Sequence, residues 1–239
     1  MLEYLELLKL IFISNERYIY IIKGLIFSVG TTACATIIGV ILGIFVALLQ
    51  LSEFYPFKNS KNKKLAGFNP LSKLAFWYVN IIRGTPVVVQ LMIWANVIFV
   101  DALRDTPILI IAAIAFGINS GAYVAEIIRA GIQSLDKGQM EAARALGMNY
   151  SLSMKEIIIP QAIRRILPPL VSEFIALLKE TSVVGFIGGV DLLRSANIIT
   201  SQTYRGVEPL IAVGIIYFIL TSVFAMIMKK VEEGLRESD

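Results

Sequence analysis

The sequence has no histidine and a single cysteine, Cys34, among 239 residues. Without histidine the chain has no imidazole for acid–base catalysis or metal ligation, and one cysteine cannot form an intrachain disulfide. Charged residues are also scarce, at 17% of the chain, against about 25% in ordinary soluble domains. Because these absences remove most catalytic and metal-binding classes, we expect no catalytic residue and no metal site.

Apolar residues are abundant, at 56% of the chain, and the mean hydropathy is +0.73. They gather in blocks comparable with the ~20 residues that a helix needs to cross a ~30 Å hydrocarbon core. The sequence therefore predicts an all-α, polytopic membrane helix bundle that forms one domain over residues 1–239. The net charge of +4 does not indicate nucleic acid, because the basic residues lie between apolar blocks, as membrane topology places them.

The apolar blocks predict five transmembrane helices. The expected spans are residues 18–51, 74–100 and 107–125, a fourth from Pro168 to the glycines at 185–189, and a fifth over 209–228.

Local signals add detail to these spans. Residues 1–17 are expected to form an N-terminal interfacial helix, because they lack a small-residue cleavage site. Gly39 and Gly43 form a GxxxG pair, which permits close helix approach. The second block is interrupted by "IRGTP", where Thr85 can cap a new helix with Pro86 in its first turn.

The distribution of basic residues predicts the orientation. The segments 52–73, 134–165 and 229–239 carry thirteen lysines and arginines, whereas the segments expected on the other side carry five. The positive-inside rule then places the N-terminus outside and the C-terminus in the cytoplasm. The segment between the third and fourth spans is therefore expected to be cytoplasmic.

That segment contains a polar, alanine-rich stretch, "EAARALGMNYSLSMKEIIIP", from Glu141 to Pro160. Asp136 is a candidate N-cap and Gly147 a natural helix stop, which predicts a helix over residues 136–148. Ser153, with Glu156 three residues later, resembles a capping box for a second short helix that Pro160 ends or kinks. The first helix suits either a groove on another protein or an amphipathic loop folded back on its own bundle.

This stretch resembles the EAA motif of ABC-importer permeases, a Glu-Ala-Ala followed by a Gly and, about nine residues on, an Ile-x-x-Pro. In that family the element is the coupling helix, which docks into the ATP-binding subunit, and the bundle has the type I importer fold. The residues expected to couple to the ATPase are Glu141, Ala142, Ala143, Leu146, Gly147, Ile157 and Pro160.

Further segments are similar to the polar amino-acid uptake branch of these permeases, namely "IRGTPVVVQL", "NSGAYVAEIIRAGIQSLDKGQMEAARALG" and "LLKETSVVGFIG". Two positions depart from that branch, Ala130 where glycine is expected and Glu180 where aspartate is commoner. The resemblance implies a non-enzymatic permease subunit for polar amino acids, in the cytoplasmic (inner) membrane of a prokaryotic cell. The excess of acidic side chains expected at membrane depth favours cationic amino acids.

The resemblance also implies partners. The chain has no GxxxxGK[ST] phosphate loop, so it is expected to bind no cofactor, with ATP and Mg on separate ABC ATPase subunits. The expected partners are a second permease copy, with a homodimer favoured over a close homologue, and an extracellular solute-binding protein. The lipid bilayer surrounds the bundle, and no nucleic acid is expected.

Ionisable side chains inside a membrane cost free energy, so each one is a candidate functional residue. Glu126 is the best candidate for a residue that binds the substrate. A structural ion pair between Glu126 and Arg129 or Arg83 is the equally weighted alternative. Thr181 and Ser182, at an expected helix break beside Glu180, can offer hydroxyls to a carboxylate. The substrate-site candidates are Glu126, Tyr123, Asn119, Arg83, Thr85, Gln90, Glu180, Thr181 and Ser182.

Two other classes stay open at this point. An ion-gradient-driven secondary amino-acid transporter would use Glu126 and Glu180 as proton or cation sites, but many such carriers have inverted repeats, and none is evident here. A non-transporting membrane scaffold is the third possibility.

Overall fold

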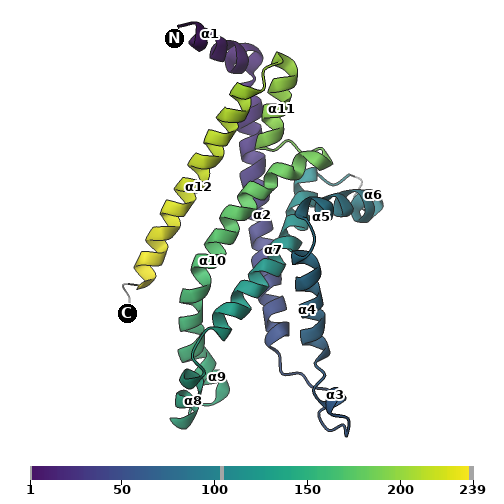
Figure 1. Ribbon diagram of the computed structural model, residues 1–239, viewed down its shortest axis with the longest axis vertical. Helices are drawn as coiled ribbons and strands as arrows, with labels where there is room; N and C mark the ends of the chain where they lie inside the picture. The colour runs from purple at the N-terminus through teal and green to yellow at the C-terminus, as the bar shows by residue number, and fades with distance from the viewer. Residues whose placement is uncertain (1, 103–104, 237–239) are drawn as a thin grey trace. The chain divides into compact units, whose positions relative to one another are not determined.

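The computed structural model describes residues 2–102 and 105–236, and within these ranges the chain is helical, with no strand. Met1, which the predicted N-terminal helix included, lies outside them. Among the described residues, three helices are long and apolar enough to cross a membrane: α2 (Tyr18–Leu51), α7 (Ile108–Gln133) and α12 (Val207–Arg236). The pair formed by α4 (Pro70–Arg83) and the residues Val87–Ile98 counts as a fourth span if a broken helix is accepted (Figure 1). These helices confirm a polytopic, all-helical protein, and the count of five spans stays a prediction.

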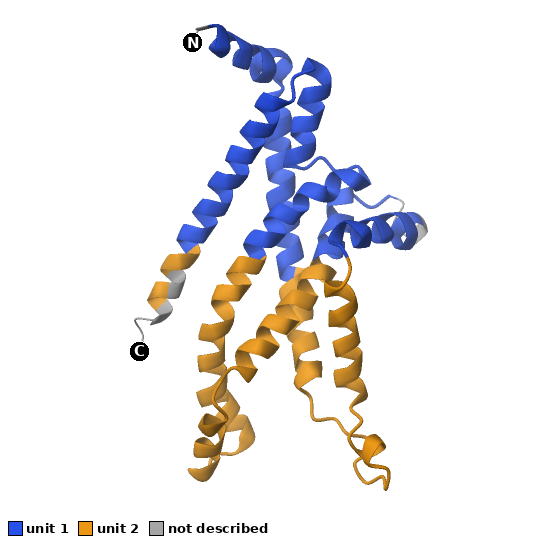
Figure 2. Ribbon diagram, in the orientation of Figure 1, with its two compact units in different colours: residues 1–37, 86–116, 174–227 blue, residues 38–85, 117–173, 228–239 orange. Residues whose placement is uncertain are grey.

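The chain divides into two compact units, each assembled from three separate stretches of sequence (Figure 2). Unit 1 comprises residues 1–37, 86–116 and 174–227. Unit 2 comprises residues 38–85, 117–173 and 228–239. Several long helices contribute one part to each unit, so the units follow packing rather than sequence order.

Unit 1 packs α2 against α11 (Leu192–Thr203) through small residues. A side chain on Gly24 would collide with Ser195 and would lie 2.7 Å from the backbone oxygen of Asp191. Ser195 Oγ lies 2.8 Å from the carbonyl oxygen of Tyr20, and the Leu192 N–H donates to Ser28 Oγ at 3.2 Å. Two apolar clusters fill this unit. Their buried members are Ala35, Leu91, Ala112, Ala115, Phe116, Leu177 and Val184 in one, and Leu192, Ala196 and Val213 in the other.

In unit 2 the predicted close approach at the GxxxG pair is confirmed. A Cβ on Gly39 would lie 2.9 Å from Ser120 Cβ, and one on Gly43 would lie 2.5 Å from Val124 Cγ1. At both positions α2 therefore meets α7 with no side chain of its own between them. The surrounding apolar cluster has as its buried members Val46, Ala47, Ala75, Val79, Ala122 and Ala125.

The helix break at "IRGTP" is confirmed, but the role given to Thr85 is wrong. The N-cap of α5 (Val87–Ile93) is Pro86, which has extended φ and ψ of −63° and 135° and makes no side-chain cap bond. Thr85 Oγ1 instead donates to the Ile81 carbonyl at 2.9 Å, back into α4. The Thr85 hydroxyl therefore bonds to a carbonyl near the end of α4 and does not cap the start of α5. A π-helical turn, η3 (Trp94–Ile98), and α6 (Phe99–Ala102) complete this region.

The N-terminal region is helical but not one continuous helix. It consists of α1 (Leu2–Leu8), the π-helical η1 (Lys9–Ile13) and the 3₁₀ turn η2 (Ser14–Glu16). Asn15 has a positive φ of 56°, which breaks the helical path just before α2 begins. Arg17 Nη1 donates to the Leu10 carbonyl at 2.8 Å, so its side chain closes the end of η1.

After α7 the chain forms α8 (Lys137–Ala145), α9 (Tyr150–Ser153), the π-helical η4 (Met154–Ile158) and α10 (Ile159–Glu180). One prediction here is wrong. Asn149, not Ser153, caps the second helix, because its side chain accepts from the Leu152 N–H at 2.9 Å. The sequence predicts that Pro160 ends or kinks the helix. It does not end it, because α10 begins at Ile159 and continues to Glu180 through Pro168 and Pro169. The π-helical turn η4, which ends at Ile158, is a local distortion of the helix just before this proline.

Candidate functional site

Local signals fix both ends of α8. The Asp136 side chain accepts from the Gly138 N–H at 2.9 Å, so the predicted N-cap is confirmed. At the other end Gly147 has a φ of +87°, which favours glycine. Its N–H donates to the Arg144 carbonyl, and the Met148 N–H donates to the Ala143 carbonyl, both at 3.1 Å. This pair of bonds is a Schellman motif, which ends the nine-residue helix α8.

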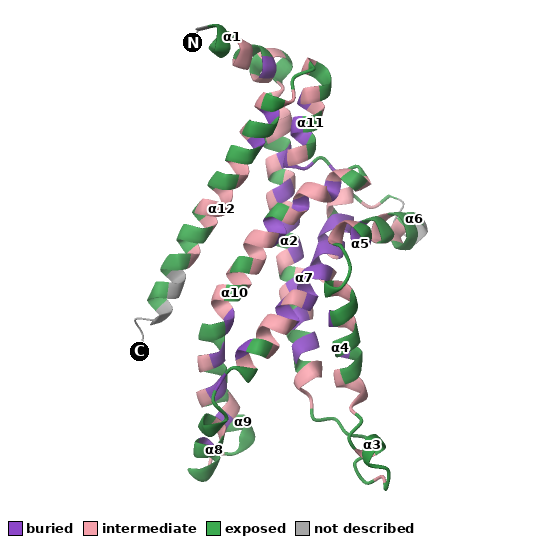
Figure 3. Ribbon diagram, in the orientation of Figure 1, coloured by how far each residue is buried: buried purple, intermediate pink, exposed green. Residues whose placement is uncertain are grey.

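The two faces of α8 differ in exposure (Figure 3). Ala143 keeps only 1% of its surface and is buried within the chain. Met140 is half-buried, and it packs on an apolar cluster whose buried members are Leu135, Ile158, Ala162 and Ile166. The outer face carries an apolar side chain, Leu146, that is 83% exposed. The other exposed residues of this face are Glu141, Ala142, Arg144, Ala145 and Gly147.

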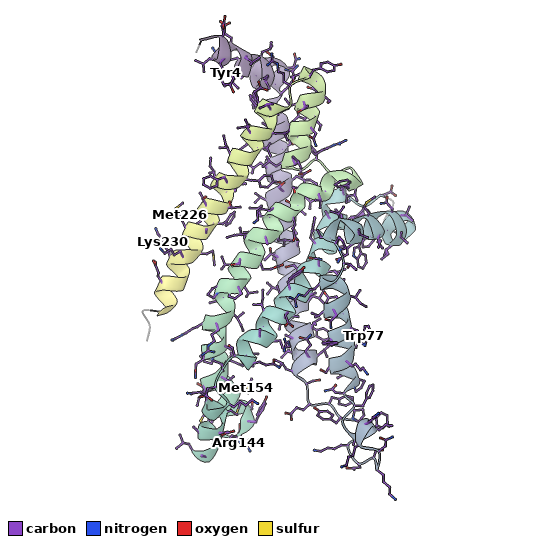
Figure 4. The ribbon with its side chains drawn as sticks, in the orientation of Figure 1. Tyr4, Trp77, Arg144, Met154, Met226 and Lys230 are labelled. Atoms are coloured by element: carbon purple, nitrogen blue, oxygen red, sulfur yellow. The ribbon has the colours of Figure 1, made fainter. Side chains whose placement is uncertain are left out.

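The predicted coupling residues therefore fall into two groups. Glu141, Ala142, Leu146 and Gly147 lie on the outer face of α8, where another chain can reach them, and Pro160 is exposed in the first turn of α10. Ala143 and the half-buried Ile157 lie on the inner side, since Ile157 packs on the same apolar cluster as Met140. The inner group holds α8 against its own bundle, and the outer group is available to a partner. Figure 4 labels Arg144 on α8, at the end of the bundle that carries this helix.

Unit 2 also contains a polar site around Glu126. The Arg129 guanidinium meets this carboxylate with two nitrogens, Nε to Oε2 at 2.9 Å and Nη2 to Oε1 at 2.5 Å. Arg83 Nη1 lies 3.9 Å from Oε1, and its guanidinium stands 5.3 Å from the centre of the Tyr123 ring. The site thus holds two positive charges around one negative charge.

The Glu126 group lines an open pocket of about 340 Å³. The Arg83 side chain is 41% exposed and the Glu126 side chain 28% exposed, so both remain in reach of a small polar molecule. The remaining lining residues are Gln50, Ser72, Phe76, Val79, Asn80, Arg129 and Gln133. Amide, hydroxyl and guanidinium groups dominate, a chemistry suited to a zwitterion or a carboxylate.

Asn119 does not line this pocket, because it is buried in α7 with 3% of its surface exposed. One residue along the helix, Ser120 Oγ donates to Glu173 Oε1 at 3.0 Å and joins α7 to α10. Sequence reasoning missed this contact. The two residues are 53 positions apart, so no local pattern indicates it.

The remaining candidates lie in unit 1. The helix break after Glu180 is confirmed, because the 3₁₀ helix η5 (Thr181–Ile187) follows α10 there. Thr181 is fully buried and donates to the Leu178 carbonyl at 2.7 Å. Ser182 lines a pocket of about 230 Å³ with Asp191, Arg194 and Asn197, among others. Gln90 is 7% exposed on α5, as its predicted inward position requires.

Asp191 is a buried structural residue that the sequence reasoning did not select. Its carboxylate accepts from the Leu193 N–H at 2.9 Å and the Arg194 N–H at 3.3 Å, so it caps α11. Burial raises the pKa of this carboxyl above its ordinary value, while the backbone hydrogen bonds act in the opposite direction. An aspartate directly before "LLRSANIIT" is an N-cap signal that could have identified it.

No cluster of three or more acidic or cysteine side chains that could hold a metal ion occurs among residues 2–102 and 105–236.

Comparison with known proteins identifies relatives that match most of the chain. Residues 65–237 match the family model described as "Binding-protein-dependent transport system inner membrane component". The chain is 40% identical over 228 residues to the arginine transport system permease protein ArtQ of Bacillus subtilis, covering 92% of this chain and 94% of that protein. It is 35% identical over 211 residues to the glutamate/aspartate import permease protein GltK of Escherichia coli O6:H1, covering 84% and 87%.

Solved structures of ABC transporters are also similar to this chain. A crystal structure of an amino acid ABC transporter with histidines matches at 43% identity with a TM-score of 0.80, covering 93% of this chain and 97% of that one. The MetNI methionine ABC transporter in an inward-facing conformation matches at 16% identity with a TM-score of 0.72, over 90% and 96%. The second likeness is one of fold alone.

Proposed function

Because the chain belongs to the family of binding-protein-dependent transport system inner membrane components, we propose that it forms the amino-acid pathway of an ATP-driven importer. It is a permease subunit of an amino-acid ABC transporter and a multi-pass membrane protein. One structural observation carries the mechanism, namely the capped α8 helix that turns Glu141 and Leu146 outward while Ala143 anchors it.

In this proposal α8 is the coupling helix. Its exposed face docks into a groove on a separate ABC ATPase subunit, which binds ATP and Mg. Closure of the ATPase pair draws the α8 helices of two permease copies together, and the bundle alternates between its two open states. The packing of Met140 and Ile157 on the same apolar cluster supports this, because it links α8 to the membrane helices rather than to a loose loop.

The finer topology belongs to the same proposal. We place the chain in the cytoplasmic membrane with five spans, counting the broken α4–α5 pair and α10 as one span each. The N-terminus is outside and the C-terminus inside. The excess of lysine and arginine in segments 52–73, 134–165 and 229–239 supports this orientation. A second copy of the chain completes the pathway, and an extracellular solute-binding protein delivers the amino acid.

The pocket around Glu126 is our proposed substrate contact. Arg83 is exposed enough to pair with an amino-acid carboxylate, and Glu126 can receive an ammonium or a cationic side chain. Gln90, Glu180, Thr181 and Ser182 are proposed as further contacts in unit 1, where Ser182 lines a second pocket.

Uptake by the reconstituted importer tests the function. Vesicles containing the chain, its ATPase and the solute-binding protein are expected to accumulate arginine only when ATP is supplied on the ATPase side. Measuring uptake with ATP, without ATP and under a proton or sodium gradient separates the classes. Accumulation driven by a gradient alone, in the absence of ATP, would overturn the proposal and favour a secondary transporter.

Replacement of Glu126 by glutamine tests its role at the pocket. We expect the KM for arginine to rise at least about tenfold, because a neutral amide loses one charge-assisted contact of about 1.5–3 kcal/mol. ATPase activity that depends on the solute-binding protein is expected to persist.

Arg129→Gln is the matched control, because it breaks the same ion pair from the other side. If Glu126 contacts the substrate, Arg129→Gln raises the KM for arginine much less than Glu126→Gln does, because it leaves the carboxylate in place. If Glu126→Gln and Arg129→Gln change the KM and the thermal stability equally, Glu126 serves only as a structural partner of Arg129.

A further inference from the structure

A basic, aromatic loop follows the first membrane helix. Between the end of α2 at Leu51 and the start of α4 at Pro70, residues 52–69 carry four lysines and one acid, Glu53, and Lys73 follows in α4. The lysines are Lys58, Lys61, Lys63 and Lys64. The short helix α3 (Lys63–Ala66) lies in this loop (Figure 1), with Asn62 as its N-cap.

Four aromatic side chains of this loop are exposed over about a third to a half of their surface. The exposed fractions are 51% for Phe54, 41% for Tyr55, 48% for Phe57 and 37% for Phe68. Three of the four lie within four consecutive residues. Aromatic rings are favoured at a membrane–water interface, where the ring meets the acyl boundary and the polar groups stay wet.

The loop is held at the membrane helices by its two ends. Asn69 Nδ2 donates to the Ser52 carbonyl at 2.6 Å, and Asn69 Oδ1 accepts from the Ser72 N–H at 3.0 Å. Ser72 Oγ in turn donates to the Gln50 carbonyl at 3.0 Å. These bonds close residues 53–68 into an Ω-like loop whose base is the adjacent ends of α2 and α4. The aromatic rings and lysines therefore stay within reach of the lipid headgroups beside α2.

One part of the loop is hollowed. Lys64 and Lys73 line an open pocket of about 700 Å³ together with Tyr55 and Phe68, and Lys73 Nζ stands 5.4 Å from the centre of the Phe68 ring. A cation beside an aromatic ring at the end of a membrane helix presents charge and apolar surface together. An anionic phospholipid offers both complements, a phosphate for the lysines and acyl chains for the rings.

We propose that residues 53–68 bind the bilayer surface through anionic phospholipid headgroups and thereby fix the adjacent ends of α2 and α4 at the membrane. The excess of lysine over acid selects negatively charged headgroups, and the aromatic side chains enter the interfacial layer. This proposal needs the membrane location of the chain but not its role in amino-acid transport.

An environment-sensitive fluorophore tests the proposal. The label is placed at Asn59→Cys in a Cys34→Ser background, and the assembled importer is put into nanodiscs of phosphatidylcholine with or without phosphatidylglycerol. We expect emission to shift toward the blue only when phosphatidylglycerol is present, and high salt to reduce the shift by screening. Inorganic phosphate added to phosphatidylcholine discs is expected to leave emission unchanged, which separates lipid from free anion. A label at Ser151→Cys, exposed on α9, is the control position.

Charge variants sharpen the test. Replacing Lys58, Lys61, Lys63 and Lys64 together by glutamine is expected to lower the ratio of apolar to aqueous emission at least about tenfold, since each lysine contributes to surface attraction. Replacing Lys9, Lys155, Lys229 and Lys230 removes the same charge elsewhere and is expected to keep the shift.

Two outcomes overturn the proposal. Aqueous emission in both lipid mixtures would mean that the loop is solvated. Apolar emission in both mixtures would mean that a partner subunit covers it. Neither depends on uptake, and a loss of arginine uptake with a normal lipid-dependent shift would count against the proposed function alone.

Discussion

Replacing Glu141 by lysine is expected to reduce ATP-driven uptake at least about thirtyfold while the chain still reaches the membrane. Glu141 is exposed on α8, so the substitution buries no charge within the chain and leaves its fold intact. In the proposed complex, however, the carboxylate enters the groove of the ATPase. Losing one partner of a buried, hydrogen-bonded charge pair costs about 2–5 kcal/mol, and 1.4 kcal/mol corresponds to tenfold. Co-purification of the ATPase and its stimulated hydrolysis measure the effect directly.

Glu156→Lys provides the matched control. It reverses the same charge in the same segment, but Glu156 lies on η4, outside α8, with a side chain that is 53% exposed. We expect this variant to keep at least half of the uptake. Normal ATPase co-purification and stimulated hydrolysis in Glu141→Lys would show that α8 is not the coupling element.

Replacing Gly24 by alanine is expected to lower the melting temperature of the complex by about 5 °C. The new Cβ would collide with Ser195 and lie 2.7 Å from the Asp191 backbone oxygen. A side chain can change rotamer, but this oxygen belongs to the residue that caps α11, so the start of that helix must move. Overpacking of this kind costs about 1–3 kcal/mol, and about 1 kcal/mol corresponds to 2–4 °C for a chain of this size.

Gly30→Ala tests the same substitution on the same helix without the collision. Its Cβ would meet only Leu109 Cδ1, at 3.9 Å, which is ordinary contact. Alanine is favoured over glycine inside a helix by about 0.5–1 kcal/mol, so we expect an unchanged or slightly higher melting temperature. Thermal unfolding of both variants in the same detergent checks the pair. Equal melting temperatures would show that the contact between α2 and α11 is loose.

The features that sequence predicted best are those set by nearby residues. Asp136 and Gly147 bound α8 because each end of the helix is satisfied within a few positions along the chain. The sequence also allowed the ion pair between Glu126 and Arg129, because residues three positions apart lie on the same face of a helix.

The errors occurred where a residue has two local choices. Threonine and serine hydroxyls either cap a helix start or bond to a carbonyl in the preceding turn, and the sequence does not say which. Thr85 and Ser153 both take the second choice, since Pro86 holds the cap position in one case and Asn149 in the other. The hydrogen bond from Ser120 to Glu173 could not be predicted from the sequence. It joins residues 53 positions apart and depends on how α7 packs against α10.

The glycine pair in α2 has a consequence for how the bundle moves. At Gly39 and Gly43 the backbone of α2 lies directly on α7. Because glycine leaves no side chain between these backbones, a larger residue at either position would push the two segments apart. If the proposed cycle operates, we expect these segments of α2 and α7 to move together and the rearrangement to occur at other helix contacts.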